Sequence, residues 1–378
     1  MHVCPNYGIV RGGVERTIDQ IASELIRRGH EVILLSGGKE KMSTDSRGVL
    51  HISTCPPFSF LGFGVNLRMM NRLLSLEPDI IHVHLNAPVT IELTTITSIF
   101  KRIPLVASYN ADPVASDILR VRSAASVVES MYSTVMRLEC NRFSRIFVLT
   151  PIYPRMSKVL RTVPRDKLLV APPGSDHITP FLVPRLNARQ ALGLTERDKV
   201  ILFVGRLVKY KGIDVLLKSF ATLRRKHPET AFRLLVVGDG RELKPLQELA
   251  SLLQIEKETR FITGVASDSV ASYMCAADVL VLPSISRSEG FGIVLLEALA
   301  CGVPCVATSM SAGPFLFADG RAGVVVPPLS PNETTEAIDG ILSSNIDDWR
   351  RDAAEKARTF TWHRTVDIIE NAYREAVA

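Results

Sequence analysis

The feature that most constrains the fold of this chain is an alternation, repeated from end to end, of short apolar runs with longer amphipathic segments. Segment 14–28 carries apolar residues at three- and four-residue spacing, as one face of a helix does, and Gly29 ends it. Strands separated by helices form βαβ units, so the first half is predicted to build a parallel sheet covered by helices. The apolar runs of strand length lie at 31–35, 79–84, 104–108 and 145–149.

The second half repeats the pattern and predicts a second domain of the same kind. A length of 378 residues also favours two domains. Segment 172–189 contains Pro-Pro-Gly and further prolines, which indicates a hinge. The strand-like runs lie at 199–204, 232–237, 259–262, 279–282, 304–307 and 323–326, and the helical patterns at 214–226, 241–253, 293–300 and within 348–378.

Composition excludes several other classes of protein. The longest apolar stretch, 291–307, is interrupted by Glu297, Gly302 and Pro304, so no segment is expected to span a membrane. Residues 1–13 show no signal-peptide pattern, and the six cysteines lie far apart without CxxC spacing. We therefore expect a cytoplasmic protein with reduced thiols.

Positive charge is concentrated in the first half of the chain. Residues 1–185 hold 22 Lys and Arg against 15 Asp and Glu, whereas residues 186–378 hold 23 against 24. This asymmetry favours an anionic partner, either nucleic acid or an acidic membrane surface, and a solvated basic face explains it equally well.

A Pro- and Gly-rich segment, 56–74, combines aromatic side chains with a basic helix. Its phenylalanines, Phe58, Phe60 and Phe63, precede Arg68 and Arg72. A loop that contacts a membrane would have this combination, but core packing by the same phenylalanines is favoured over it.

A glycine pair, Gly12 and Gly13, opens the first helix. Glycine lets the backbone approach a ligand closely, and the N–H groups at a helix start favour a phosphate; a tight turn without a ligand is the alternative. The pattern is not GxGxxG, and no acidic residue ends the strand 31–35. A dinucleotide-dependent oxidoreductase, a rival with the same sheet architecture, is therefore not favoured.

Two cationic residues follow the strand 199–204. Arg206 and Lys211 lie in the loop that begins with Gly205, at the carboxyl end of this strand, where open α/β sheets bind ligands. A planar guanidinium and a compact ammonium can converge on one diphosphate, whereas a solvated surface pair needs no ligand.

The sequence Glu289-Gly290-Phe291-Gly292 is the most specific segment of the chain. Its glycines free backbone N–H groups at the start of a helix, which again favours an anion. Glu297 follows within that apolar helix, where a carboxylate is costly unless a ligand or a partner satisfies it. Two carboxylates that accept hydrogen bonds from hydroxyl groups suggest a sugar at one end of the ligand and a ribose at the other.

Three polar residues are weaker candidates. Asp239 lies between two glycines after the strand 232–237 and either lines a nucleotide pocket or makes a turn. His82 and His84 alternate along the strand 79–84 and share one face. Because no third ligand is evident nearby in sequence, contacts near an acceptor are favoured over zinc binding.

In order along the chain, the motifs GGVE, HVH, GRLVKYKG, VVGDG, AADVLVLPS and EGFGIVLLE closely resemble the family 4 glycosyltransferases of the GT-B fold, from Gly12 to Tyr373. The resemblance implies an α/β architecture of two Rossmann-like, doubly wound domains that face each other across a cleft. Residues 1–180 would take the acceptor and residues 181–359 the nucleotide-sugar donor, with the helix 360–378 returning to the first domain. The resemblance also implies a retaining hexosyltransferase without a metal or other cofactor, since cationic side chains and helix dipoles stabilise the leaving group.

The same resemblance assigns roles to residues. Arg206 and Lys211 would bind the donor diphosphate, and Glu289 the donor sugar; we expect these three to be catalytic. Glu297 would bind the ribose. From the residues themselves, we expect the acceptor, a glycan or a lipid-linked molecule, near His82 and His84, and the basic first half suggests an anionic membrane surface as a partner; no nucleic acid is expected. Further donor contacts are expected from Gly12, Gly13, Asn110, Gly205, Asp239, Gly290, Phe291 and Gly292.

One position departs from the family pattern. Many relatives carry a histidine at the end of the strand 105–109, where this chain has Asn110. Asparagine donates and accepts hydrogen bonds but does not titrate near neutrality. A catalytically silent homologue that binds a sugar nucleotide or a partner therefore stays open as the alternative to an enzyme.

Overall fold

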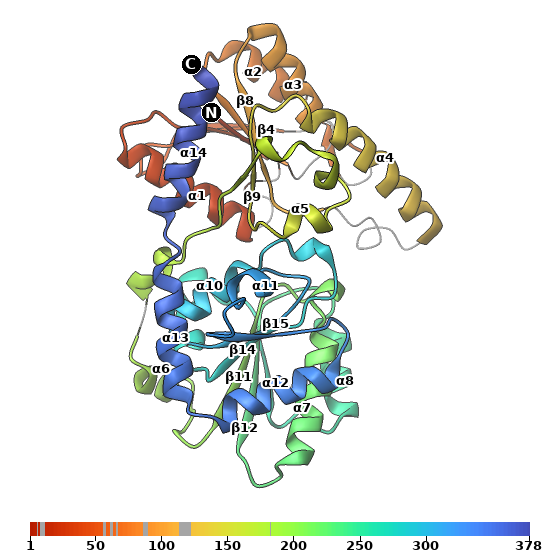
Figure 1. Ribbon diagram of the computed structural model, residues 1–378, viewed down its shortest axis with the longest axis vertical. Helices are drawn as coiled ribbons and strands as arrows, with labels where there is room; N and C mark the ends of the chain where they lie inside the picture. Colours follow the sequence, from red (N-terminus) through yellow and green to blue (C-terminus); the bar gives the residue numbers. More distant parts are fainter. Residues whose placement is uncertain are drawn as a thin grey trace. The chain divides into compact units, whose positions relative to one another are not determined.

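The computed structural model of the chain consists of two compact units (Figure 1). Unit 1 comprises Met1–Pro173 and Trp362–Ala378, and unit 2 comprises Gly174–Thr361. The first crossing between the units lies inside the proline-rich segment 172–189. The sequence predicted that the chain passes from the first domain to the second after residue 180 and returns after residue 359; in the structure it does so after Pro173 and Thr361. The structure describes residues 1–5, 7, 12–55, 58–60, 63–65, 67–85, 90–112, 122–181 and 183–378.

Unit 1 is built on an eight-stranded sheet in the order β10-β9-β8-β7-β1-β2-β4-β3. All neighbouring strands are parallel except β3 and β4. A separate antiparallel pair is formed by β5 (Phe58–Phe60) and β6 (Phe63–Val65). The strands of the large sheet are β1 (His2–Cys4), β2 (Ile33–Gly37), β3 (Lys41–Thr44), β4 (Leu50–Thr54), β7 (Ile81–His84), β8 (Leu105–Tyr109), β9 (Ile146–Val148) and β10 (Leu168–Val170).

Helices cover both faces of this sheet. Apolar residues of α2, α3, α4 and α5 share one buried cluster with the strands, and residues of α1 and α14 share another. Strand side chains alternate between the clusters: Val3 belongs to the first and Cys4 to the second, as the period of two requires. The helices are α1 (Gly13–Arg27), α2 (Leu67–Ser75), α3 (Thr90–Lys101), α4 (Arg122–Cys140), α5 (Tyr153–Met156) and α14 (Trp362–Val377).

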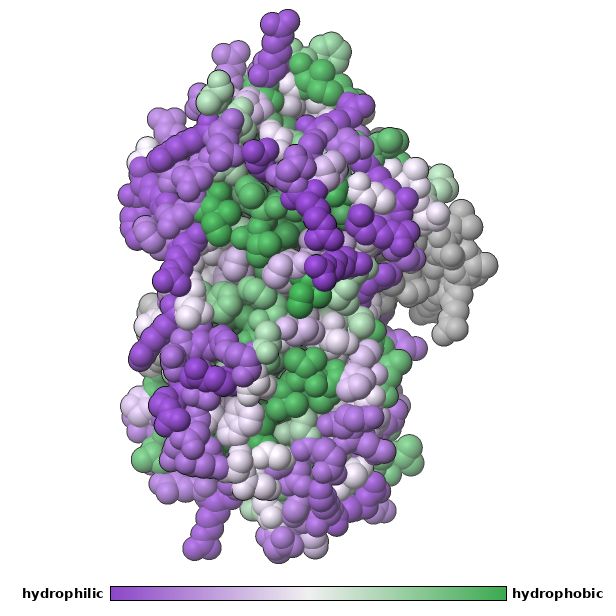
Figure 2. Space-filling model, in the orientation of Figure 1, coloured by the Kyte–Doolittle hydropathy of each residue, from purple (hydrophilic) through white to green (hydrophobic). Residues whose placement is uncertain are grey.

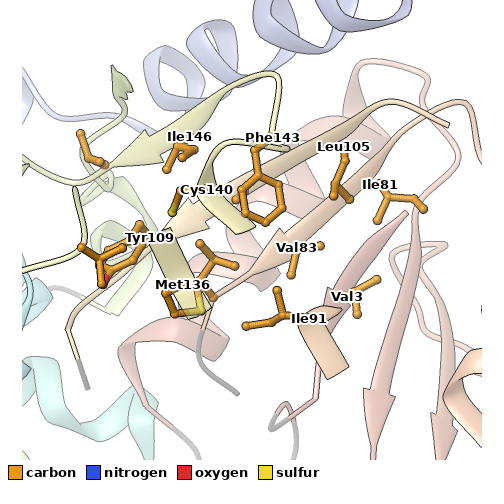
Figure 3. Packing of buried hydrophobic residues seen from close by; sticks show 14 of the residues in the cluster. Val3, Ile81, Val83, Ile91, Leu105, Tyr109, Met136, Cys140, Phe143 and Ile146 are labelled. Atoms are coloured by element: carbon orange, nitrogen blue, oxygen red, sulfur yellow. The ribbon is translucent and has the colours of Figure 1, made fainter. Parts of the chain in front are cut away.

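The first of these clusters explains why the strands read as nearly continuous apolar runs. Val83 of β7 and Leu105 of β8 lie in the same core as Ile91 of α3 and Met136 of α4 (Figure 3). Strands buried on both faces need apolar residues at successive positions, not only at alternate ones.

The last helix, α14, packs onto unit 1 although it is distant in sequence. Val366 and Ile369 are buried against the cluster that contains α1. At the helix surface, Arg28 Nη1 lies 2.7 Å from Glu370 Oε2. Inside, the hydroxyl of Tyr373 lies 2.5 Å from His82 Nδ1. Apolar burial supplies most of this attachment, and the polar pairs set the register of the helix on the sheet.

Unit 2 contains a six-stranded, fully parallel sheet in the order β13-β12-β11-β14-β15-β16. Its strands are β11 (Lys199–Val204), β12 (Phe232–Val237), β13 (Thr259–Ile262), β14 (Val279–Leu282), β15 (Cys305–Thr308) and β16 (Gly323–Val326). Its helices are α6 (Arg185–Ala191), α7 (Ile213–Lys226), α8 (Leu243–Leu252), α9 (Val270–Ala276), α10 (Ile293–Ala300), α11 (Gly313–Leu316), α12 (Pro331–Ser343) and α13 (Ile346–Arg358).

In each unit the first strand of the sheet lies in its interior, and later strands lie on both sides of it. In unit 2, β11 has β12 on one side and β14 on the other; in unit 1, β1 has β2 and β7 as neighbours. Ligands bind at such switch points, beyond the carboxyl ends of the strands. The expected fold class, α/β with two parallel-sheet domains, is confirmed. Among the described helices, none has the length and apolar character needed to cross a membrane.

Candidate active site

The loops that follow β11 and β14, the two strands at the switch point of unit 2, are joined by an ion pair. Lys211 Nζ lies 2.8 Å from the carboxylate of Glu289. Lys211 is 9% exposed, and a Cβ atom added to Gly205 would lie 3.8 Å from its Nζ. The structure therefore brings together Gly205, Lys211 and Glu289, three of the predicted site residues.

The Glu289 carboxylate is held from a second side by a residue that sequence reasoning missed. Ser284 Oγ donates a hydrogen bond to Glu289 Oε2. Thr308 Oγ1 of β15 donates in turn to the main-chain oxygen of Ser284, at 2.5 Å. A carboxylate held by an ammonium and a hydroxyl has a defined orientation, which a sugar-binding group needs. Ser284 lies five residues before Glu289 and ends the motif AADVLVLPS, but the sequence assigned it no role.

Arg206 occupies the outer part of the same loop. Its side chain is exposed, and its Nη2 donates to the Tyr210 hydroxyl at 3.1 Å. The ammonium of Lys211 lies 5.5 Å from the centre of the Tyr210 ring. The two cations thus flank one aromatic ring at the carboxyl edge of the sheet, a geometry that allows both to reach the same anion.

Close backbone contacts explain the glycines of the neighbouring loop. A Cβ atom on Gly238 would lie 1.9 Å from the oxygen of Gly205, and one on Gly240 would lie 2.2 Å from the oxygen of Leu207. Only glycine permits this approach. Between them, Asp239 accepts a hydrogen bond from the N–H of Gly264 at 3.0 Å. Its side chain is exposed, and the bond joins the loop after β12 to the loop after β13, so both sequence interpretations of Asp239, a nucleotide contact and a turn, stay open.

The helix α10 begins at the glycine-rich loop. Gly292 has φ +81°, and a Cβ atom there would lie 2.4 Å from Leu282, so the position requires glycine. No side chain caps this helix start. Phe291 is 2% exposed, so its side chain belongs to the core of unit 2 and does not face a ligand. Gly290 precedes it with φ +62°, also in the left-handed region.

Glu297 lies on α10 and is almost fully buried. Its Oε1 is 3.0 Å from Nε2 of His177, which lies in a 3₁₀ turn, Asp176–Phe181. The sequence predicted that this carboxylate needs a partner, and the structure supplies one from the segment that joins the two units. His177 was not identified from sequence because it lies 120 positions from Glu297.

The predicted donor-binding residues of the first half belong to unit 1. Gly12 caps α1 with extended backbone and no side-chain cap, and Gly13 begins the helix. Asn110 follows β8 and is partly buried; among the residues that the structure describes, its Nδ2 has no hydrogen-bond partner. These residues lie at the carboxyl edge of the unit 1 sheet, next to its switch point.

The expectation that His82 and His84 contact an acceptor is corrected by the structure. Both are buried, at 1% and 0% exposure, because β7 is covered on both faces. His82 contacts the hydroxyls of Tyr373 and of Ser108, the latter at 2.7 Å from Nε2. The two rings therefore contribute to the core of unit 1 rather than to a surface.

A third histidine, distant in sequence, completes this cluster. His2 of β1 lies beside His82 in register, and its Nδ1 is 3.1 Å from His84 Nε2. The rings of His82 and His84 stack, with centroids 4.6 Å apart and planes inclined by 17°. The ligand nitrogens of the three rings all lie within 4.8 Å of one another, a spacing that could hold a metal ion, and His2 is the third ligand that was not evident nearby in sequence. Burial lowers the pKa of all three, that of His84 to about 3, so the cluster is neutral.

An apolar stripe lies on the outer face of two helices of unit 1, and we call it the α3–α4 stripe. Green side chains interrupt the hydrophilic surface along the upper right edge of Figure 2, where these helices lie. The side chains of the segment 56–67, including Phe58, Phe60 and Phe63, lie outside the part that the structure describes. The stripe consists of Ile96 (46% exposed), Ile99 (56%) and Phe100 (81%) on α3, and Met131 (66%), Val135 (40%) and Leu138 (62%) on α4.

Two family models together match most of the chain. The Glycosyltransferase Family 4 model matches residues 11–177, and the model of Glycosyl transferases group 1 matches residues 184–360. The chain belongs to family 4 of the GT-B glycosyltransferases. The two matches meet within the proline-rich segment 172–189, so each model corresponds to one unit of the structure.

Among curated family members, the chain is similar to D-inositol 3-phosphate glycosyltransferases. It is 33% identical to the protein of Corynebacterium aurimucosum over 227 residues, which are 56% of this chain and 52% of that protein. It is 33% identical to the protein of Saccharomonospora viridis over 286 residues, 71% of this chain and 62% of that one. The chain thus spans about half to three-fifths of the length of these relatives.

Solved structures share the fold over nearly the whole chain. Sucrose-phosphate synthase from Thermosynechococcus elongatus superposes with a TM-score of 0.81 at 19% identity and covers 99% of this chain and 98% of its own. Anabaena HepE, solved in complex with UDP and glucose, has a TM-score of 0.79 at 20% identity, with 99% of both chains covered.

Proposed function

We propose that the protein is a retaining glycosyltransferase that moves a hexose from a nucleoside diphosphate sugar to an acceptor hydroxyl. The observation that carries this proposal is the Lys211–Glu289 ion pair, which joins two loops at the switch point of unit 2. The names of the curated relatives and the UDP and glucose bound to HepE support it.

Each group would act on a different part of the donor. Arg206 and Lys211 would neutralise the diphosphate, whose charge increases as the sugar departs. Glu289 and the main-chain N–H groups of Phe291 and Gly292 would hold the sugar, and Glu297 the ribose. In this proposal two cations and the start of α10 would face the leaving group, and the reaction would need no metal ion.

The acceptor would be bound by unit 1, whose switch point carries Gly12, Gly13 and Asn110. The Nδ2 of Asn110, which has no partner among the described residues, supports a role toward the donor sugar, because a buried amide nitrogen without a partner costs free energy that a ligand oxygen would recover. The same residue supports the second candidate, a homologue that binds a sugar nucleotide without turnover, since asparagine cannot shuttle a proton near neutrality.

The test is release of the nucleoside diphosphate from UDP-, GDP- and ADP-hexoses in the presence of glycan and lipid-linked acceptors. We expect turnover with one base, unaffected by EDTA, and retention of the anomeric configuration in the product. Glu289→Ala and Arg206→Ala should remove it. Binding of a nucleotide sugar without any turnover would favour the silent homologue, and absence of nucleotide binding by the folded protein would contradict both.

We further propose that the α3–α4 stripe docks on an anionic membrane, at whose inner face a lipid-linked acceptor would be reached. Three side chains on each helix recur at helical spacing and expose large apolar surface. Lys101 and Arg102 follow the stripe on α3, and Arg137 and Arg142 lie on or after α4. Apolar side chains bordered by basic ones match the chemistry of an anionic lipid surface.

Liposome flotation tests this docking surface. The protein should float with vesicles that contain anionic phospholipid and much less with neutral ones, and Phe100→Ser combined with Leu138→Ser should abolish flotation. Leu252→Ser, at an 80% exposed leucine of unit 2, is the matched control. A dimer that the paired substitutions dissociate, without flotation, would assign the stripe to a second copy instead.

A further inference from the structure

We propose that His177 is a positioning residue that orients Glu297 toward the ribose of the nucleotide donor. The inference rests on the proposed function and extends it to a residue outside the family motifs. It also assigns a role in ligand binding to the segment by which the chain enters unit 2. The contact that carries it is the 3.0 Å distance between His177 Nε2 and Glu297 Oε1.

The backbone around His177 is held in place independently of that contact. The N–H of Ser175 donates to the oxygen of Phe360 at 3.0 Å, and its hydroxyl to the oxygen of Ala357 at 3.1 Å. The next residue after His177, Ile178, is 5% exposed. The imidazole therefore approaches α10 from a segment that is fixed on both sides, which is what a positioning group requires.

Glu297 needs such a group because of where it lies on α10. Its neighbours Leu296 and Ala298 are fully buried, and the carboxylate itself is 3% exposed. A buried carboxylate without hydrogen-bond donors is strongly disfavoured. A bond from an imidazole N–H is charge-assisted and fixes the side-chain rotamer.

The bond to His177 does not prevent Glu297 from binding a ligand. A carboxylate offers about four acceptor positions on its two oxygens, so it can accept more than one hydrogen bond at a time. Two adjacent ribose hydroxyls can be accepted by a carboxylate whose plane is already set. If the rotamer were free, part of the binding free energy would be lost in ordering it.

The test compares ribose recognition with nucleotide affinity as a whole. UDP, GDP or ADP, whichever raises the melting temperature most, is titrated alongside its 2′,3′-dideoxy analogue. The variants are His177→Ala, which removes the donor, and His177→Gln, whose amide N–H replaces Nε2. The control is His227→Ala, because His227 Nε2 pairs with Asp339 at 3.0 Å elsewhere in the same unit.

The wild-type protein and His227→Ala should bind the ribonucleotide about 10-fold more tightly than the dideoxy analogue, as expected for hydrogen bonds to a charged group. In His177→Ala this ratio should fall close to one, whereas His177→Gln should restore most of it. A purely structural role would weaken both ligands equally and leave the ratio unchanged, and that result overturns the inference.

The outcomes separate this inference from the function on which it rests. If the folded wild-type protein binds none of the three nucleotides, the proposed function fails. If it binds one of them with an unchanged ratio in His177→Ala, only the role of His177 fails. Should His177→Ala not fold, His177→Asn takes its place, because its shorter amide cannot reach Glu297 from the same backbone position; an unchanged ratio there would equally overturn the inference.

Discussion

The two units share one architecture and use the switch point of the sheet in opposite ways. In unit 2 the charged residues beyond the strands pair with one another, Lys211 with Glu289 and His177 with Glu297. In unit 1 the conspicuous polar residues of β7, His82 and His84, are buried and neutral, and their hydrogen-bond partners are other side chains of the core. Near their switch points the two sheets thus carry different groups: ion pairs beyond the strands of unit 2 and neutral imidazoles within a strand of unit 1.

The difference follows from where each residue stands relative to the strand end. His82 lies within β7, so the helices on both faces cover it, whereas Lys211 and Glu289 lie in loops beyond β11 and β14. The loop ions Lys211 and Glu289 are largely buried but neutralise each other, while the interior of β7 holds imidazoles that burial keeps neutral.

Breaking the ion pair of unit 2 should have the largest effect. Lys211→Ala or Glu289→Ala should lower turnover by about 10² to 10³-fold. Each substitution removes a group that would stabilise the reacting donor, and each leaves the buried partner of that group unpaired. The measurement is release of nucleoside diphosphate from the donor. Lys226→Ala, which removes the exposed pair with Glu336, should have no effect on turnover. Equal losses in all three variants would contradict a specific role for the ion pair.

Acid should destabilise unit 1 more than unit 2. The pKa values of His2, His82 and His84 are lowered by burial, so the unfolded chain binds more protons than the folded one below about pH 6.5. The free energy of unfolding therefore has its full value above about pH 6.5 with respect to these histidines and decreases as the pH falls below it. Between pH 6.5 and 5.5 each histidine should cost about 1 kcal/mol of unfolding free energy.

The two tryptophans allow this comparison to be made within one molecule. Trp362 is buried in unit 1, and Trp349 lies on α13 of unit 2. In Trp349→Phe, urea unfolding followed by the fluorescence of Trp362 should show that the unfolding free energy of unit 1 decreases at low pH. Adding His84→Gln should make this pH dependence smaller. In Trp362→Phe the remaining Trp349 reports on unit 2. If the unfolding free energy of unit 2 depended equally on pH, the expected difference between the units would be contradicted.

Asn110 tests whether unit 1 takes part in donor chemistry. Asn110→Ala removes the amide whose Nδ2 has no partner among the described residues, and turnover should fall about 5- to 10-fold, the value of one hydrogen bond. The affinity for the nucleoside diphosphate alone should be unchanged. Asn71→Ala, at an exposed position of α2, is the control. Unchanged turnover in Asn110→Ala would separate this residue from the reaction.

The smallest effect is expected at Ser284, which orients Glu289 without contacting the ligand. Ser284→Ala should raise KM for the sugar nucleotide about 3-fold, because the loss of one hydrogen bond leaves Glu289 less well oriented. Ser343→Ala removes a comparable hydroxyl–carboxylate bond, to Asp339 at 3.1 Å, and should leave KM unchanged. Identical values for both variants would show that Lys211 alone is sufficient to hold Glu289.

Much of the fold follows from local patterns in the sequence. The predicted strands at 199–204 and 232–237 coincide with β11 and β12, because a continuous apolar run in a parallel sheet needs no further information. The helix α3 was not predicted: Thr90–Lys101 contains mainly β-branched residues, which disfavour helices. There Thr95 and Thr97 donate to main-chain oxygens one turn earlier, and tertiary packing determines the outcome.

The sequence by itself determined the chemical character of the site: the cations after β11, the carboxylates around the start of α10, and the glycines that the backbone contacts require. Only the tertiary structure decided which of these groups meet, since Lys211 and Glu289 are 78 positions apart and His177 and Glu297 are 120 apart. It also removed His82 and His84 from the surface by covering β7 on both faces. The physical reason is that residue type and spacing specify local conformation and charge, whereas burial and long-range partners depend on how distant segments pack.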